Sequence, residues 1–223
     1  MPIMSGEHVL VLAKAPAPGR SKTRLSPVFG PVQAAAIAEA ALADTLDAVA
    51  RCNVERKIIA LDGEPGLWLP PGFDVVPQVS GTLNERLAAA WAYADGPGLQ
   101  IGMDTPQVTP ELLERSLAAV DGHGADAALG LAKDGGWWAI ALRGPHPEAF
   151  RDVPMSRPDT GRRQHARLRS LGLDVALLPM LQDLDDADDA RAVTELIPGS
   201  RTASAVRDAY SSLRASSTTT GMS

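Results

Sequence analysis

Short apolar runs alternate with longer amphipathic segments along the first 200 residues of the chain. The first run, "VLVLA" at residues 9–13, has no polar side chain, which is typical of a strand buried on both faces of a sheet. The pattern predicts seven strands, which cover His8–Ala13, Lys57–Leu61, Phe73–Val76, Leu99–Met103, Ala125–Ala132, Trp137–Arg143 and Asp174–Leu178.

Helix signals lie between most of these strands. Residues 31–50 are rich in alanine and contain no glycine and no internal proline, and Pro31 suits the first turn of a helix. Thr109 precedes Pro110, in a position that is typical of an N-cap. The predicted helices cover residues 31–50, 82–94, 110–120, 159–171 and 186–196.

Strands that alternate with helices imply an α/β fold with a mostly parallel, doubly wound sheet that helices cover on both faces. Two strands follow each other directly around Gly135 and Gly136, which indicates a small antiparallel insert. We expect one domain over residues 1–199. We expect residues 200–223 to form a Ser/Thr-rich tail that is partly disordered.

Composition narrows the classes of partner and compartment. A net charge of -6 argues against broad binding to nucleic acid or to an anionic membrane surface. The single cysteine, Cys52, excludes an internal disulfide and a cysteine-based zinc site. No apolar run is long enough to span a bilayer, and the first residues lack the regions of a signal peptide, so the cytoplasm is the expected location. Whether the chain forms a homodimer stays open.

Positive charge gathers in one short loop of this acidic chain, "AKAPAPGRSKTRL" at residues 13–25. The loop holds Lys14, Arg20, Lys22 and Arg24, and Gly19 frees the backbone to turn. It follows the first strand, and ligands of doubly wound proteins bind at the carboxyl ends of strands. It lacks the glycine patterns of a P-loop and of a dinucleotide site. The sequence favours a phosphate site here over a solvated basic turn.

Carboxylates follow two predicted elements near the same edge. Asp104 comes directly after the fourth strand, where it is placed to hold Mg²⁺ or Mn²⁺ or merely to cap the next helix. The stretch "DLDDADDA" contains five acids between Asp183 and Asp189. Asp185 or Asp186 suits the N-cap of the last predicted helix. Alternatively, Asp183 or Asp185 supplies a second metal ligand.

The stretch "KDGGWW" combines the carboxylate of Asp134 with Gly135, Gly136 and two tryptophans. Glycine allows a ligand to approach the backbone closely, and an indole can stack on a sugar ring or fill the core. Because side chains alternate along a strand, only one of Trp137 and Trp138 can line a site. The stretch "MSRPDTGRRQHARL" adds three further candidates for the same ligand site: Ser156, Thr160 and Arg163.

Several motifs in this order resemble the DUF2064 family. They are "VLAKAPAPGRSKTRLSPVFGPVQAAAIAEAALADTL", "PQVSGTLNERLAAAW", "IGMDTPQVTPELL", "LGLAKDGGWWAIAL" and "DLDDADDA", and the resemblance covers roughly residues 8–197. The family consists of glycosyltransferase-like proteins with the GT-A, or nucleotide-diphospho-sugar transferase, fold. It is related to nucleotidyltransferases of the phospholactate guanylyltransferase and molybdenum cofactor guanylyltransferase types. The resemblance implies the same fold for this chain.

The resemblance also assigns roles to residues. In the related enzymes the loop after the first strand wraps the phosphates of the nucleotide. The "SKTRL" of this chain is similar to the "AKSRL" of phospholactate guanylyltransferases, and the catalytic residues that the resemblance implies are Lys22, Arg24 and Asp104. The nucleotide-binding set that it implies is Ala13, Lys14, Gly19, Arg20, Lys22, Arg24, Gln78, Gly81, Leu83 and Arg86.

Metal and acceptor sites follow from the same resemblance. Asp104 matches the "GxDxP" pattern and is the implied ligand of Mg²⁺ or Mn²⁺, although Gly102 stands where many GT-A transferases have the first Asp of a DxD motif. Asp183 and Asp185 are the further implied metal ligands. The implied substrate residues are Asp134, Gly135, Gly136, Trp137 and Thr160.

Three functions are compatible with these residues. The first is a metal-dependent glycosyltransferase that moves a sugar from a nucleotide-diphospho-sugar to a small acceptor. The second is a guanylyltransferase-like nucleotidyltransferase that joins an NTP to a phosphorylated small molecule, which the density of cations in the first loop favours. The third is a non-catalytic sensor of nucleotides or sugar phosphates, because the DxD motif is reduced. The sequence slightly favours sugar transfer.

Overall fold

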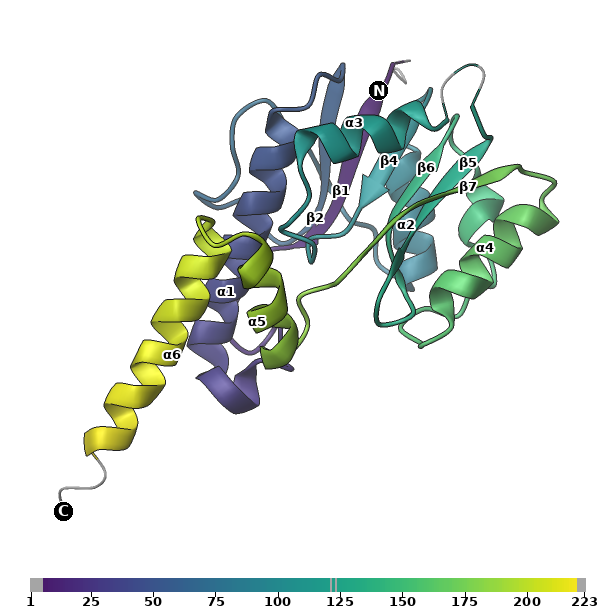
Figure 1. The fold of residues 1–223 in the computed structure, drawn as a ribbon. Coiled ribbons are helices and arrows are strands. Elements are labelled where there is room, and N and C mark those ends of the chain that lie inside the picture. The colour runs from purple at the N-terminus through teal and green to yellow at the C-terminus, as the bar shows by residue number, and fades with distance from the viewer. Residues whose placement is uncertain (1–5, 121, 123, 220–223) are drawn as a thin grey trace.

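A computed structural model describes residues 6–120, 122 and 124–219. Residues 1–5 of the expected domain and residues 220–223 of the expected tail lie outside this range. All seven predicted strands are present (Figure 1): β1 (His8–Lys14), β2 (Arg56–Asp62), β3 (Asp74–Pro77), β4 (Gly98–Ile101), β5 (Ala127–Ala132), β6 (Trp137–Leu142) and β7 (Val175–Leu181). The helices are α1 (Ser26–Ala50), α2 (Leu83–Trp91), α3 (Pro110–Ala118), η1 (Pro147–Phe150), α4 (Thr160–Ser170), α5 (Ala187–Leu196) and α6 (Arg201–Thr219).

The strands form a single sheet in the order β3-β2-β1-β4-β6-β5-β7. Strand β6 pairs antiparallel with both β4 and β5, whereas the other neighbours pair in parallel. This arrangement confirms the mostly parallel sheet with a small antiparallel insert. The β5–β6 connection is the short turn around Gly135 and Gly136, which brings the "KDGG" residues to the same edge as the carboxyl ends of β1 and β4.

Helices cover both faces of the sheet, as the doubly wound pattern predicts. On one face, Val9 and Val11 of β1 pack in a cluster with Leu46 of α1 and Leu113 of α3. On the other face, Leu10 packs in a cluster that includes residues of α2, η1 and α4. Successive side chains of a strand point to opposite faces, so the nearly continuous apolar sequence of β1 serves both clusters. Among the described residues, none of the helices is both long and apolar enough to cross a lipid bilayer.

Helix α1 starts earlier than the sequence predicts. It begins at Ser26 and bends at Gly30, whose φ of 79° is in the left-handed region. Pro31 follows the bend and opens the straight part of the helix, which corresponds to the predicted helix of residues 31–50. Proline has no backbone N–H. It suits this place because the N–H groups of the first helical residues have no carbonyl partner within the helix.

The segment expected as a tail is largely helical instead. Residues 201–219 form α6, which lies beside α1 in Figure 1. Val206 and Ala209 of α6 are buried against Phe29 and Ile37 of α1, with residues of α5 completing this third cluster. The apolar residues of α6 form a narrow stripe, because residues on one face of a helix recur every three or four positions. The serines and threonines between them obscure this stripe in the sequence.

Asp44 of α1 provides the polar contact that holds the start of α6. Its carboxylate accepts hydrogen bonds from the backbone N–H of Thr202 at 2.8 Å and from the Thr202 hydroxyl at 2.6 Å. The Asp44 side chain is only 12% exposed. The acid thus caps the helix from a neighbouring element.

We predict that Asp44→Ala lowers the free energy of unfolding by about 2 kcal/mol, because three donors, the N–H groups of Arg201 and Thr202 and the Thr202 hydroxyl, lose a charged and largely buried acceptor. Urea denaturation of the full chain measures this change. Glu39→Ala, which removes an exposed carboxylate from the same helix, is the control and should leave the midpoint unchanged. Equal midpoints for both variants would contradict the docking of α6.

Candidate functional site

Two segments meet at the carboxyl edge of the sheet. One is the loop of residues 15–25 after β1, and the other comprises residues 102–106 after β4. A cleft of about 400 Å³ opens beside them, and a smaller cavity of about 260 Å³ adjoins it under the basic loop. The two cavities share four lining residues: Lys14, Met103, Asp104 and Asp185. The site therefore has a basic compartment and a larger compartment with carboxylates between them.

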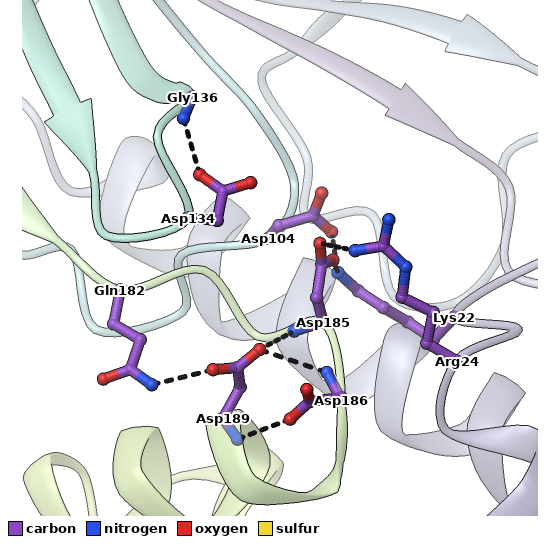
Figure 2. Close-up of polar contacts among 9 residues, drawn as sticks. All are labelled: Lys22, Arg24, Asp104, Asp134, Gly136, Gln182, Asp185, Asp186 and Asp189. Carbon is purple, nitrogen blue, oxygen red and sulfur yellow. Dashed lines mark hydrogen bonds and ion pairs between the residues drawn. The ribbon is translucent and has the colours of Figure 1, made fainter. Parts of the chain in front are cut away.

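Lys22 lies among the carboxylates between the two cavities (Figure 2). Its ammonium nitrogen lies 2.5 Å from Asp104 Oδ1 and 2.9 Å from Asp185 Oδ1, and its side chain is 7% exposed. Arg24 reaches the other oxygen of Asp185 at 3.1 Å, while its own side chain stays 73% exposed. We call these four residues the ionic cluster. They bring together three segments that are far apart in the sequence.

Hydrogen bonds within the basic loop hold it in a compact turn, from which Lys22 reaches Asp104 and Asp185. The carbonyl of Ala17 accepts hydrogen bonds from the N–H groups of Arg20 and Ser21, and the Ser21 hydroxyl accepts one from the Ala17 N–H, all at 3.1 Å. Gly19 (φ 74°) and Lys22 (φ 47°) both adopt the left-handed conformation. Lysine rarely adopts it, because its Cβ crowds the backbone, so the surrounding contacts must hold it there.

The acidic stretch divides into structural and site-facing residues. Asp186 caps α5 by accepting hydrogen bonds from the N–H groups of Asp188 and Asp189, both at 2.9 Å, so the N-cap is Asp186. Asp189 accepts from the backbone N–H groups of Asp185 and Asp186 and from the Gln182 amide, as Figure 2 shows. Asp183 and Asp185 are left to face the cleft.

A backbone hydrogen bond fixes the acidic stretch beside Asp104. The N–H of Leu184 donates to the Asp104 carbonyl at 2.9 Å, and the Leu184 side chain is fully buried against α1 and α5. The residues on either side of Leu184 must therefore project toward Asp104. This is the physical reason that carboxylates separated by about 80 positions share one cleft.

The electrostatics of these groups follow from burial and from their neighbours. Burial raises the pKa of Asp183 to about 7, and the nearby carboxylates of Asp104, Asp134 and Asp185 add to that effect. Burial also opposes ionisation of Asp185, but Lys22 and Arg24 outweigh it and hold the Asp185 pKa below its usual range. For Lys22, burial is again the largest single effect, yet its two carboxylate partners together raise its pKa.

The metal ligands expected from the sequence are Asp104, Asp183 and Asp185. Within the part of the chain that the structure describes, no group of three or more His, Cys, Asp or Glu side chains is arranged to hold a metal ion. In this structure the Lys22 ammonium lies between two members of the expected set, Asp104 and Asp185. The same ammonium shows that Asp104 and Asp185 can hold a cation between them. Their oxygens are the ligands that Mg²⁺ prefers, so the residues present fit a divalent ion if Lys22 moves aside.

Most residues expected around the nucleotide do line the two cavities. Those in the larger cleft are Ala13, Lys14, Gln78, Leu83 and Arg86, and those in the basic cavity are Lys14, Arg20, Lys22 and Arg24. The amide of Gln78 donates to the carbonyls of Ala13 and Ala60 and accepts from Arg86 at 3.0 Å, so its orientation is fixed. Gly19 and Gly81 line neither cavity, and their backbones (φ 74° and 125°) shape the turns instead.

The expected acceptor residues fall on the far wall of the larger cleft. Asp134, Gly136, Trp137 and Thr160 line it, whereas Gly135 does not. Trp137 faces the cleft and stacks with Phe150, while Trp138 is 2% exposed, so the tryptophans alternate as predicted. Asp134 accepts a hydrogen bond from the Gly136 N–H at 2.7 Å, which holds the turn (Figure 2).

Sequence reasoning missed part of this wall. Met155 and Arg157 line the cleft beside Ser156, and Gln100 lies at its base. Arg163, which the sequence placed with the acceptor residues, instead pairs with Asp159 at 2.6 Å. A run of arginines gives no indication of which one faces a cleft, because that depends on the turn before the helix.

Comparisons with known proteins identify relatives along most of the chain. A phosphoenolpyruvate guanylyltransferase from Thermomonospora curvata is 33% identical over 193 residues, 82% of each chain. A 2-phospho-L-lactate guanylyltransferase from Halomicrobium mukohataei is 29% identical over 177 residues, 79% of each. A solved structure from Desulfovibrio desulfuricans G20, provisionally designated a nucleotide-diphospho-sugar transferase, superposes with a TM-score of 0.82 at 26% identity and covers 93% of this chain and 96% of its own.

These likenesses establish the general class of the protein. The fold is that of the nucleotide-diphospho-sugar transferases, as the sequence motifs imply, and the protein is a transferase. A sequence profile of DUF2064, described as an uncharacterized protein conserved in bacteria, matches residues 33–157. Since that match spans more than half of the chain, the protein belongs to the DUF2064 family.

Proposed function

We propose that this transferase is a nucleotidyltransferase that joins the nucleoside monophosphate part of an NTP, with GTP as the first candidate, to a phosphorylated small molecule. The ionic cluster carries this proposal, because it joins a compact basic cavity to a cleft with room for a nucleoside and an acceptor. The names of the two guanylyltransferase relatives support the same reaction.

The basic cavity suits the phosphates of the donor. Arg20, Lys22 and Arg24 border it, and arginine forks match the geometry of phosphate oxygens. Gln78 and Arg86 lie in the larger cleft, where a fixed amide and guanidinium suit the polar edge of a base. The donor would then lie across the end of β1, with its phosphates under the loop and its base over α2.

The reaction requires an acceptor phosphate near the α-phosphorus, a metal ion at the reacting phosphates and cations at the leaving group. A phosphate oxygen of the acceptor attacks the α-phosphorus, the new P–O bond forms, and the bond to the β-phosphate breaks to release pyrophosphate. Asp104 and Asp185, with Asp183 beside them, would hold Mg²⁺ or Mn²⁺, which supplies charge neutralisation at the reacting phosphates. Lys22 and Arg24 hold the β- and γ-phosphates and stabilise the charge that develops on the leaving group.

Sugar transfer, which the sequence slightly favours, is the second candidate. The likeness to the protein from D. desulfuricans and the indole of Trp137 in the cleft support it. Both reactions use the same phosphate loop and the same carboxylates, so the fold does not distinguish them. The nucleotidyltransferase is preferred because both guanylyltransferase relatives match about four fifths of the chain.

We predict that the protein with GTP, Mg²⁺ and either phosphoenolpyruvate or 2-phospho-L-lactate releases pyrophosphate and forms one guanylylated product. Asp104→Asn should lower the rate at least about 100-fold, because one preorganised charge is lost at the reacting phosphates. Coupled pyrophosphate detection and mass spectrometry of the product provide the measurement.

The competing arms use UDP-glucose and GDP-mannose with the same acceptors. Release of a nucleoside diphosphate in these arms, without pyrophosphate in the first, would reject nucleotidyl transfer in favour of sugar transfer. Binding of GTP that leads to no turnover with any acceptor in the panel would favour the non-catalytic sensor.

We also predict that Lys22→Met strengthens Mn²⁺ binding in the absence of nucleotide, by about ten-fold, because the competing ammonium is removed from between Asp104 and Asp185. GTP binding should weaken in the same variant, since a phosphate ligand is lost. Mn²⁺ titration followed by electron paramagnetic resonance, together with calorimetry for GTP, measures both. Lys57→Met, which removes an equal charge at the opposite end of the sheet, is the control. Unchanged or weaker Mn²⁺ binding in Lys22→Met would contradict the idea that the Lys22 ammonium and the metal ion compete for Asp104 and Asp185.

A further inference from the structure

The turn of residues 154–160, between η1 and α4, is held by hydrogen bonds of Thr160 and carries Arg157. The Thr160 hydroxyl donates to the Pro154 carbonyl at 2.8 Å and accepts from the Arg157 N–H at 3.0 Å, and the Thr160 side chain is buried. The Thr160 N–H donates to the Arg157 carbonyl at 3.0 Å. Thr160, expected to contact substrate, has its hydroxyl occupied in building this turn.

The same turn is fixed against the "DGG" residues. The Gly161 N–H donates to the Gly135 carbonyl at 2.8 Å. A Cβ atom on Gly135 would lie 1.9 Å from the Pro158 carbonyl oxygen, so only glycine permits this approach. The turn and the Asp134–Gly136 segment therefore form one rigid wall of the cleft.

Strain marks the point where this wall faces the cleft. Ser156 has a φ of 57°, a left-handed conformation that costs a serine free energy unless neighbouring contacts impose it. Ser156 and Arg157 both line the larger cleft. The strained residue thus lies where the chain turns along the cleft wall, directly before Arg157.

The arginines of α4 form ion pairs with carboxylates, which Arg157 does not do with any of the described residues. Arg162 and Arg163 pair with Asp159, and Arg167 pairs with Glu148. Arg157 is exposed, and it acts on Asp159 only at longer range, since no carboxylate of the described residues lies within 4 Å of its guanidinium. It is therefore a cation on the cleft wall with its fork of donors available to a ligand.

We infer that Arg157 is the residue of the cleft wall that binds the carboxylate of the phosphorylated acceptor. This inference rests on the proposed nucleotidyl transfer. The reacting phosphate must lie near Asp104 and the donor's α-phosphate, so a second anionic group of a small acceptor extends toward the wall that carries Arg157. An arginine fork accepts a carboxylate in two parallel hydrogen bonds, and such a contact selects against a neutral group in the same place.

A matched pair of ligands tests this inference. Isopropyl phosphate has the skeleton of 2-phospho-L-lactate with a methyl group in place of the carboxylate. Calorimetric titrations of both use the full chain with Mg²⁺ and a GTP analogue that cannot be cleaved between the α- and β-phosphates. Arg157→Gln should weaken 2-phospho-L-lactate binding about ten-fold or more and isopropyl phosphate binding less than two-fold. Arg157→Lys should give an intermediate loss, because it keeps the charge without the fork.

Arg162→Gln is the matched control, since it removes an equal charge from a neighbouring, 83% exposed side chain. Equal affinities for both ligands in the wild type, or equal effects of Arg157→Gln and Arg162→Gln, would overturn the inference. Binding of the GTP analogue is measured separately in each protein. Its absence from the wild type would instead refute the proposed nucleotidyl transfer, and the acceptor inference with it.

Discussion

One ammonium group between two carboxylates governs the arrangement of the site. Lys22 comes from the loop after β1, Asp104 from the end of β4, and Asp185 from the segment before α5. Each of these charges would be unfavourable in a half-buried cleft by itself, and each is acceptable because the others are present. The pairing therefore determines where the loop closes, how the acidic segment approaches and where the two cavities meet.

The distribution of charge around that pairing suits a reaction between two anions. Arg20 and Arg24 border the cavity on one side of the carboxylates, and Arg157 lines the wall on the other. Two negatively charged reactants repel each other, and a site that joins them must offset that repulsion at both ends. In the proposed reaction the cleft would provide this with separate cationic regions, while Lys22 would have to move from between Asp104 and Asp185 before a metal ion could enter.

Periodicity predicted the architecture because it reports on burial. The seven strands, the antiparallel insert and the two helical layers follow from short apolar runs separated by amphipathic segments. The narrow stripe of α6 was missed, since alanine and valine among serines give a weak signal. The "SKTRL" and "GMDTP" motifs indicated Lys22 and Asp104, but their direct contact depends on side-chain positions that no local pattern encodes. The sequence also indicated Asp186 as one of two N-cap candidates, which the structure confirms, whereas the role of Asp189 depends on backbone N–H groups that become available only where α5 begins.

The third cluster, formed by residues of α1, α5 and α6, affects the order in which the site can form during synthesis. Leu25, which directly follows the basic loop, and Leu184, which lies within the acidic stretch, are buried in the same cluster as Val206 and Ala209 of α6. A ribosome synthesises α6 last among the described elements, so the segment that carries Lys22 emerges long before the helix that completes its support, whereas the segment that carries Asp185 emerges shortly before it. The sheet can form while the chain is still growing. The apolar cluster that supports the paired charges at the edge of the sheet is complete only after the residues of α6 have left the ribosome.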